Sequence, residues 1–219
     1  MNYRFPNSLS RFLLSRLCLP AVAVSILHAG CRPAATQIET AAPPDATSSE
    51  PTFAEQLAQV TAGNSSRIEV HATLIRDGDL AGIAAAKGLE TLILDNTEIA
   101  DDGLAQIAEL PNLVDLRLSR TAVTSDGLKH LARLPQLERL RFGSRHVTDA
   151  GLAHIAQLAN LRALILVDTP ISDAGLEHVR DLADLESLYL QRTQVTDDGV
   201  DRLQAHRIER GLPVLHVHW

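Results

Sequence analysis

Ile99-Ala-Asp-Asp-Gly-Leu104 is the first of five copies of one short phrase. The other copies are Val123-Thr-Ser-Asp-Gly-Leu128, Val147-Thr-Asp-Ala-Gly-Leu152, Ile171-Ser-Asp-Ala-Gly-Leu176 and Val195-Thr-Asp-Asp-Gly-Val200. Their glycines follow one another at a constant step of 24 residues. A strict period of this length is typical of a repeat array, in which one supersecondary unit stacks on copies of itself.

Each 24-residue row has the same apolar skeleton. Across the five rows that begin at Leu89, 34 of the 35 skeleton positions are apolar, and His206 is the exception. Within a row, segment 116–118 alternates as a strand does, whereas segment 128–134 carries leucines at helical spacing. Each row is therefore predicted to hold one short strand, a turn and one short helix.

The strand segments and the phrase together resemble the leucine-rich repeat, L-x-x-L-x-L-x-x-N/C-x-L. The segments are Leu89-Glu-Thr-Leu92-Ile-Leu94, Leu113-Val-Asp-Leu116-Arg-Leu118, Leu137-Glu-Arg-Leu140-Arg-Phe142, Leu161-Arg-Ala-Leu164-Ile-Leu166 and Leu185-Glu-Ser-Leu188-Tyr-Leu190. The later half, V-T-D-x-G-L-x-x-L, is similar to the cysteine-containing class of F-box adaptor proteins and to arrays in many exported bacterial proteins. The resemblance covers residues 67–219. It implies an α/β leucine-rich-repeat solenoid, a curved right-handed array of about six to seven repeats with concave parallel strands and convex short helices.

Threonine occupies the position where the repeat pattern expects Asn or Cys, at Thr73, Thr97, Thr121, Thr169 and Thr193. An inward hydroxyl at the end of a strand can hydrogen-bond backbone groups of the turn, which would otherwise be buried unpaired. We therefore interpret the column as structural and not as a ligand-binding ladder. Arg145 interrupts it, so that row is expected to have a different turn, beside Gly143 and Ser144.

Paired acids recur in the phrase, at Asp101 and Asp102 and again at Asp197 and Asp198. A calcium loop needs several oxygen ligands that converge within one loop, whereas these acids recur once per row and are expected to point outward. Helix capping explains them better, with Thr or Ser at the N-cap and an acid in the first turn, near the positive end of the helix dipole. We predict no calcium site.

Histidines share one helical register at His130, His154 and His178, and two more stand at His216 and His218. Three imidazoles in a row could chelate zinc. However, no Cys or acid shares the column, and helices in such arrays are spaced more widely than the strands at about 4.8 Å. We interpret these residues as partly exposed spacers and predict neither a metal nor a cofactor.

Residues 1–30 have the order of a secretory signal. A basic start with Arg4, Arg11 and Arg16 precedes the apolar stretch 17–27 and then small residues. A stretch of eleven residues is too short to span a bilayer. Ala29-Gly30-Cys31 resembles the end of a bacterial lipobox, with His28 where the motif normally has Leu. The resemblance implies that Cys31 is lipidated and becomes the new N-terminus; plain secretion is the alternative.

The segment 31–66 is rich in Pro, Ala, Thr and Ser and is predicted to be the lipid-anchor Cys followed by a flexible tether. A short helix over Phe53–Val60 is expected to cap or precede the array of residues 67–219. At the other end, the alternation of Leu215, Val217 and Trp219 suggests a last strand that closes the core. The array should then have about seven strands.

Removal of residues 1–30 would leave 17 basic and 27 acidic side chains, a net charge of about −10. A body this acidic argues against nucleic acid as a partner, because phosphate binding needs a net positive surface. The only cysteines are Cys18 and Cys31, so the processed chain would lack a disulfide and its stability would come from the stacked core.

The predicted concave face offers a candidate site. Its residues include a basic centre of Arg117, Arg139 and Arg141 and an apolar third with Ile165 and Tyr189. Arginine beside exposed aliphatic and aromatic groups is the composition of a protein-binding surface; an ordinary solvated face is the alternative. We predict a non-enzymatic, monomeric protein-interaction module, anchored to a bacterial envelope membrane by lipid and facing the periplasm or the cell surface.

Two other functions are less favoured. A hydrolase of envelope polymers would need catalytic machinery, yet the array has no G-x-S-x-G, no H-E-x-x-H, no phosphate loop and no Cys nucleophile. An F-box-type ubiquitin-ligase adaptor follows from family analogy alone. It conflicts with the signal and with the absence of an F-box in the Pro/Ala/Thr-rich segment 32–66.

Overall fold

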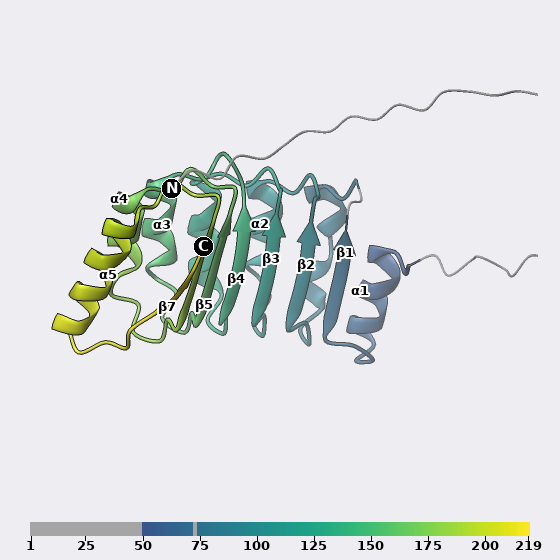
Figure 1. Ribbon diagram of the computed structural model, residues 1–219. Helices are drawn as coiled ribbons and strands as arrows, with labels where there is room; N and C mark the ends of the chain where they lie inside the picture. Colours follow the sequence, from purple (N-terminus) through teal and green to yellow (C-terminus); the bar gives the residue numbers. More distant parts are fainter. Residues whose placement is uncertain (1–49, 72–73) are drawn as a thin grey trace, which may run out of the picture. The chain divides into compact units, whose positions relative to one another are not determined.

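The computed structural model describes residues 50–71 and 74–219 and shows, within them, seven parallel strands in one open sheet (Figure 1). The strands are β1 (Arg67–His71), β2 (Thr91–Asp95), β3 (Asp115–Ser119), β4 (Arg139–Gly143), β5 (Ala163–Val167), β6 (Ser187–Gln191) and β7 (His216–His218). Each strand pairs with the next along the chain. Residues 1–30, Cys31 and Thr73 lie outside the described part.

Short helices follow the strands and cover one face of the sheet (Figure 1). They are η1 (Asp77–Leu80) and η2 (Ile83–Ala85), then α2 (Asp101–Ile107), η3 (Gly127–Arg133), α3 (Asp149–Ile155), α4 (Asp173–Val179) and α5 (Asp197–Glu209). Three of these, η1 to η3, are 3-10 helices. The predicted leucine-rich-repeat solenoid, with one strand and one short helix per row, is confirmed.

The core is made of the skeleton residues, which stack on their own copies from row to row. One column of strand leucines is fully buried throughout, at Leu92, Leu116, Leu140, Leu164 and Leu188. Burying one such side chain contributes roughly 1.5–3 kcal/mol. The exception at His206 is half-buried, and the next residue, Arg207, is the one that enters the core in that row.

In four rows an acid two residues before the repeat glycine, or at the equivalent position Asp77, connects its row to the next one. Asp101 accepts the Thr124 backbone N–H at 2.8 Å and the Thr124 hydroxyl at 2.6 Å. The same bond joins Asp77, Asp149 and Asp173 to Ala100, Ser172 and Thr196. The expectation that the paired acids point outward is therefore wrong for Asp101, because its carboxylate accepts hydrogen bonds at the start of the following helix.

The constant glycine lies against these acids. A Cβ on Gly127 would stand 2.1 Å from Asp101 Oδ1, and Gly103, Gly175 and Gly199 meet the acid of the previous row in the same way. Ser125 replaces the acid in one row, and there a Cβ on Gly151 would have its nearest neighbours at 3.1 Å. Glycine thus recurs because the carboxylate fills the space that a side chain would need.

Thr97, Thr121 and Thr193 close the turns after the strands, as expected, whereas the buried Thr169 hydroxyl has no hydrogen-bond partner within the described residues. Thr97 and Thr121 donate to the carbonyls of Leu94 and Leu118 at 2.9 and 3.1 Å. In these rows the residue before the threonine has a left-handed backbone, with φ near +60° at Asn96, Arg120, Asp168 and Arg192. The row of Arg145 differs, as predicted: Ser144 replaces the left-handed residue and donates to the Val123 carbonyl at 2.6 Å.

At each end of the array a glutamine side chain hydrogen-bonds the backbone N–H and C=O of one residue. The predicted helix forms as α1 (Phe53–Thr61), and its Gln56 bonds both the N–H and the C=O of Glu69 on β1. At the other end Gln204 of α5 bonds the N–H and C=O of Leu215. The predicted last strand forms as β7, with Leu215 buried and Val217 packed against the core, whereas Trp219 follows the strand and is 56% exposed.

Arg207 completes the C-terminal end from inside. It is fully buried and donates to the carbonyls of Arg180, Leu182, Leu185 and Pro213 at 2.8–3.1 Å. Burial lowers the pKa of the Arg207 guanidinium below its ordinary value, and the charge of Asp181 opposes this shift in part. The Arg207 guanidinium thus provides hydrogen bonds to carbonyl groups that have no following row to pair with.

We expect Gly127→Ala to destabilise the array, because the new methyl group would force Asp101 away from Thr124. Hydrogen bonds to charged groups are worth about 1.5–3 kcal/mol, so the free energy of unfolding in urea should fall by roughly that amount. Gly151→Ala is the matched control, since it faces Ser125 and has more room. Equal losses in the two variants would show that the acid does not impose the glycine.

Candidate functional site

One face of the sheet is not covered by the helices, and we call it the open face (Figure 1). Side chains alternate along a strand, so every second residue points to this face while the leucines between them are buried. It corresponds to the face that the sequence predicts to be concave. The candidate site residues lie here.

The strand register aligns one residue from each strand into a continuous row across the open face, the central row. From β1 to β7 its members are Glu69, Ile93, Arg117, Arg141, Ile165, Tyr189 and His218. Adjacent members are carried by strands about 4.8 Å apart. Four of the five predicted partner-binding residues share this row, and the fifth, Arg139, stands two residues before Arg141 on the same face of β4.

Asp115 holds two of the three predicted arginines. Its side chain is only 6% exposed, and it bonds Arg117 Nη2 at 3.2 Å and Arg139 Nε at 3.2 Å. The hydrogen bond that Arg117 donates to Asp115 raises the pKa of Arg117 above its ordinary value, against the effect of burial. The basic centre is thus anchored and partly neutralised. The sequence reasoning did not find this pairing. The repeat period could have revealed it, because Asp115 stands 24 positions before Arg139 and so lies beside it on the neighbouring strand.

Arg141 has a different environment. It is half-buried and its Nε donates to the Ser119 hydroxyl at 2.9 Å. Within the described residues, Arg141 has no carboxylate at salt-bridge distance. Its positive charge is therefore available on the open face, whereas Arg117 and Arg139 share one negative charge.

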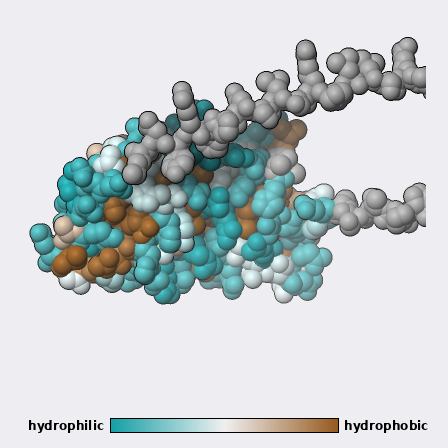
Figure 2. Space-filling model, in the orientation of Figure 1, coloured by the Kyte–Doolittle hydropathy of each residue, from teal (hydrophilic) through white to brown (hydrophobic). Residues whose placement is uncertain are grey.

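The apolar part of the central row lies toward the C-terminal end. Ile165 and Tyr189 are half-buried, and the Tyr189 ring stacks on the His218 ring with centroids 4.3 Å apart and planes at 14°. The sequence pattern does not place His218 on this face, because the 29-residue step from Tyr189 to His218 differs from the 24-residue period. Hydrophobic residues gather at the end of the array that bears α5 and β7 (Figure 2).

Two adjoining hollows lie at the carboxyl ends of the strands, on either side of Gly143. The first, of about 220 Å³, includes Arg120, Arg141 and Gly143 in its lining. The second, of about 300 Å³, is lined by Arg120, Gly143 and Arg145 among others. Asp168 borders both.

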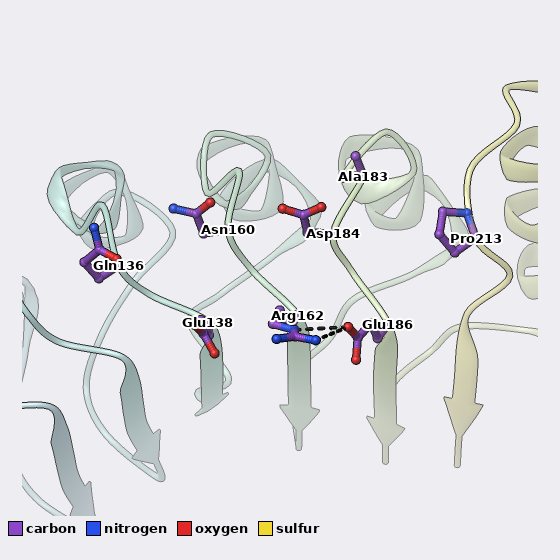
Figure 3. Close-up of a pocket in the computed structure, with 8 residues that line it drawn as sticks. All are labelled: Gln136, Glu138, Asn160, Arg162, Ala183, Asp184, Glu186 and Pro213. Atoms are coloured by element: carbon purple, nitrogen blue, oxygen red, sulfur yellow. Dashed lines mark hydrogen bonds and ion pairs between the residues drawn. The ribbon is translucent and has the colours of Figure 1, made fainter.

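A third hollow, of about 500 Å³, lies where the chain enters β4 to β6 (Figure 3). Its charged lining consists of Glu138, Asp184, Glu186 and Arg162, and Arg162 Nε donates to Glu186 at 3.0 Å. That bond raises the pKa of Arg162, with smaller contributions from Glu138 and Asp184. The lining of this hollow therefore has a net negative charge, whereas the two hollows beside Gly143 have more arginines than acids in their lining.

Within residues 50–71 and 74–219, no group of three or more His, Cys, Asp or Glu side chains is placed to hold a metal ion. Helices in the same part of the chain are too short or too polar to cross a membrane.

No protein-family model matches the chain, and no curated protein matches it in sequence. The structure is similar to the crystal structure of an internalin from Listeria monocytogenes, with a TM-score of 0.52 and 20% identity. The similarity covers 69% of this chain and only 39% of the internalin chain. At this identity the likeness shows the fold alone, a leucine-rich-repeat solenoid.

Asp115→Asn should lower the free energy of unfolding by about 1–2 kcal/mol, because Arg117 and Arg139 lose a charged hydrogen-bond acceptor while remaining partly solvated. Urea unfolding measures this change. The control is the same substitution in an Arg117→Gln, Arg139→Gln background, where it should lower the free energy of unfolding by a smaller amount. An identical cost in both backgrounds would mean that Asp115 stabilises the sheet independently of the arginines.

Proposed function

We propose that the array is a non-enzymatic protein-interaction module that binds a protein partner on its open face. The partner-binding residues would be Arg117, Arg139, Arg141, Ile165 and Tyr189. The observation that supports this most is their placement in or beside one continuous row of a face that no helix covers. A partner would meet charged groups at Arg117 and Arg141 and apolar surface at Ile165 and Tyr189.

The dimensions of the row suit a protein interface. From Arg117 on β3 to His218 on β7 it crosses four strand spacings, or about 19 Å at 4.8 Å each. Interface energy concentrates in a few aromatic and arginine residues near the centre, surrounded by polar contacts that exclude water. Tyr189, with its ring fixed on His218, is a pre-ordered aromatic anchor of this kind, and Arg141 supplies the charged one.

The anchored arginines add pre-organisation. Because Asp115 already fixes Arg117 and Arg139, little side-chain freedom would be lost when they contact a partner. Each immobilised flexible side chain otherwise costs about 0.5–1.5 kcal/mol on binding. The proposed site therefore combines a rigid basic part with one arginine, Arg141, that keeps its charge available.

We further propose that the protein is exported and anchored to the bacterial envelope. Residues 1–30 would be the signal, Cys31 the lipidated N-terminus, and residues 31–66 the tether that holds the array of residues 67–219 away from the membrane. The support comes from the sequence: the basic, apolar and small-residue order followed by Ala29-Gly30-Cys31. The module would work as a monomer with a protein partner and without nucleic acid.

The open-face site is tested by capture from envelope extract with the full chain. The double variant Ile165→Ser, Tyr189→Ala should lose most of the retained partner, because both residues supply the apolar part of the row. The amount of each captured protein is measured by quantitative mass spectrometry, and circular dichroism confirms that the variant is folded.

The matched control is Ile208→Ser, Trp219→Ala, which removes an aliphatic and an aromatic side chain that are 62% and 56% exposed away from the central row. It should retain the partner. If the control loses as much partner as the open-face variant, the binding site lies elsewhere.

The anchor is tested by Cys31→Ser, which should block acylation and either release the chain from membranes or leave it uncleaved. Cys18→Ser, inside the proposed signal, should change neither outcome. Fractionation and the mass of the N-terminal peptide report the result. A Cys31→Ser chain that is processed at the same site and still sediments with membranes would contradict the lipid anchor.

A further inference from the structure

Arginine in this protein is almost always paired with an acid. Of the 14 arginines in residues 50–71 and 74–219, ten have a carboxylate partner in that part of the chain. The four exceptions are Arg120, Arg141, Arg145 and Arg207. Arg207 is fully buried on backbone carbonyls. The other three all line the two hollows beside Gly143.

The partners of these three arginines leave most of their N–H groups free to bind something else. Arg120 Nη1 donates to Asn96 Oδ1 at 3.2 Å, and Arg141 Nε donates to Ser119 Oγ at 2.9 Å. Arg145 is exposed and donates no hydrogen bond within the described residues. Each guanidinium has five N–H donors, so the three together offer far more donors than the surrounding side chains accept.

The hollows lie where the row of Gly143 departs from the repeat. The equivalent residues in the neighbouring rows are Asp95, Ser119, Val167 and Gln191. Gly143 is therefore the member of this group that has no side chain. A Cβ there would lie 2.5 Å from the Val167 carbonyl oxygen. The next two positions also depart, with Ser144 in place of a left-handed residue and Arg145 in place of threonine. Four other rows close with a left-handed residue followed by threonine, so stacking does not require Ser144 and Arg145. Gly143 itself is required by the close approach of the Val167 carbonyl.

Two acids also line the hollows, and both are already engaged. Asp95 accepts the Ser119 backbone N–H at 2.7 Å. Asp168 is paired with Arg192, whose hydrogen bond lowers the pKa of that carboxyl, and the charges of Arg120 and Arg145 lower it further. Four arginines therefore face two carboxylates, which leaves the lining with a net positive charge.

We propose that the hollows at Gly143 form a subsite for a carboxylate side chain, an Asp or Glu of the protein partner, held by Arg120, Arg141 and Arg145. This deepens the proposed function and rests on it, because Arg141 belongs both to the central row and to the hollow. The planar guanidinium fork matches a carboxylate in two parallel hydrogen bonds.

Size and charge favour a carboxylate side chain over other anions. Small-molecule sites usually have volumes of about 300–1,000 Å³, and these hollows, at about 220 and 300 Å³, hold a side chain better than a cofactor. A phosphate group carries a charge of about −1.5 to −2 and would lie close to Asp95 and Asp168. A carboxylate with a single negative charge meets less of that repulsion.

The probe for the test is the capped peptide Ser-Gly-Glu-Glu-Gly-Ser, with the same peptide carrying two glutamines as the uncharged control. Phenylglyoxal modifies free arginines, and mass spectrometry gives the rate at each one in the full chain. The glutamate peptide should slow modification at Arg120, Arg141 and Arg145, and the glutamine peptide should not. Equal protection by both peptides, or protection confined to Arg117 and Arg139, would overturn the assignment.

Variants locate the site independently. Arg145→Gln and Arg120→Asn should each weaken binding of the glutamate peptide about tenfold, the equivalent of one charged hydrogen bond. Asparagine is chosen at position 120 because it tolerates the left-handed backbone there. Ligand-observed NMR gives the dissociation constants. Arg133→Gln is the matched control, an exposed arginine paired with Glu109, and should have little effect. An equal loss in the control would mean attraction by overall charge and would refute the subsite.

Two further outcomes separate this inference from the proposed function. If the Ile165→Ser, Tyr189→Ala variant loses the envelope partner but the glutamate peptide protects no arginine, the open face binds proteins and the carboxylate subsite is wrong. If a phosphoserine peptide of the same length binds more tightly than the glutamate peptide, the subsite takes phosphate and the carboxylate assignment is wrong.

Discussion

A fixed step of 24 residues between equivalent backbone positions is the constraint on which the rest of the structure depends. Each row can bury its leucines only against the copies in the neighbouring rows, so any change of step would misalign the whole column. The aspartates reinforce the step by binding the start of the next helix, as Asp101 does at Thr124. Leucine, aspartate and glycine therefore recur together for one reason.

An array of this kind has two ends where the next row is missing. Here side chains take over the hydrogen bonds that the missing row would make. Gln56 and Gln204 each bond both backbone groups of one residue, on β1 and just before β7. Arg207 does the same for carbonyls inside the last row. The stability of the ends thus depends on single polar residues more than that of the centre does.

The constraint acts only on the inward half of each row and leaves the open face free to vary. Residues there stand beside their counterparts 24 positions away, so columns of the sequence become rows of the surface. Between Arg117 and Tyr189 the central row changes from charged to apolar. The departures at Ser144 and Arg145 are not required for stacking, and they lie beside the arginines that lack an acid.

The sequence by itself determined the solenoid, the strand and helix of each row, the buried columns and the residues of the open face other than His218. It could do so because a constant period makes each residue's neighbour in space predictable from its number. It did not reveal that Asp115 holds Arg117 and Arg139, or that Arg207 and not His206 is buried. Only the tertiary structure decided these contacts, because they depend on how far a side chain reaches and on what the last row lacks, and neither property follows the repeat.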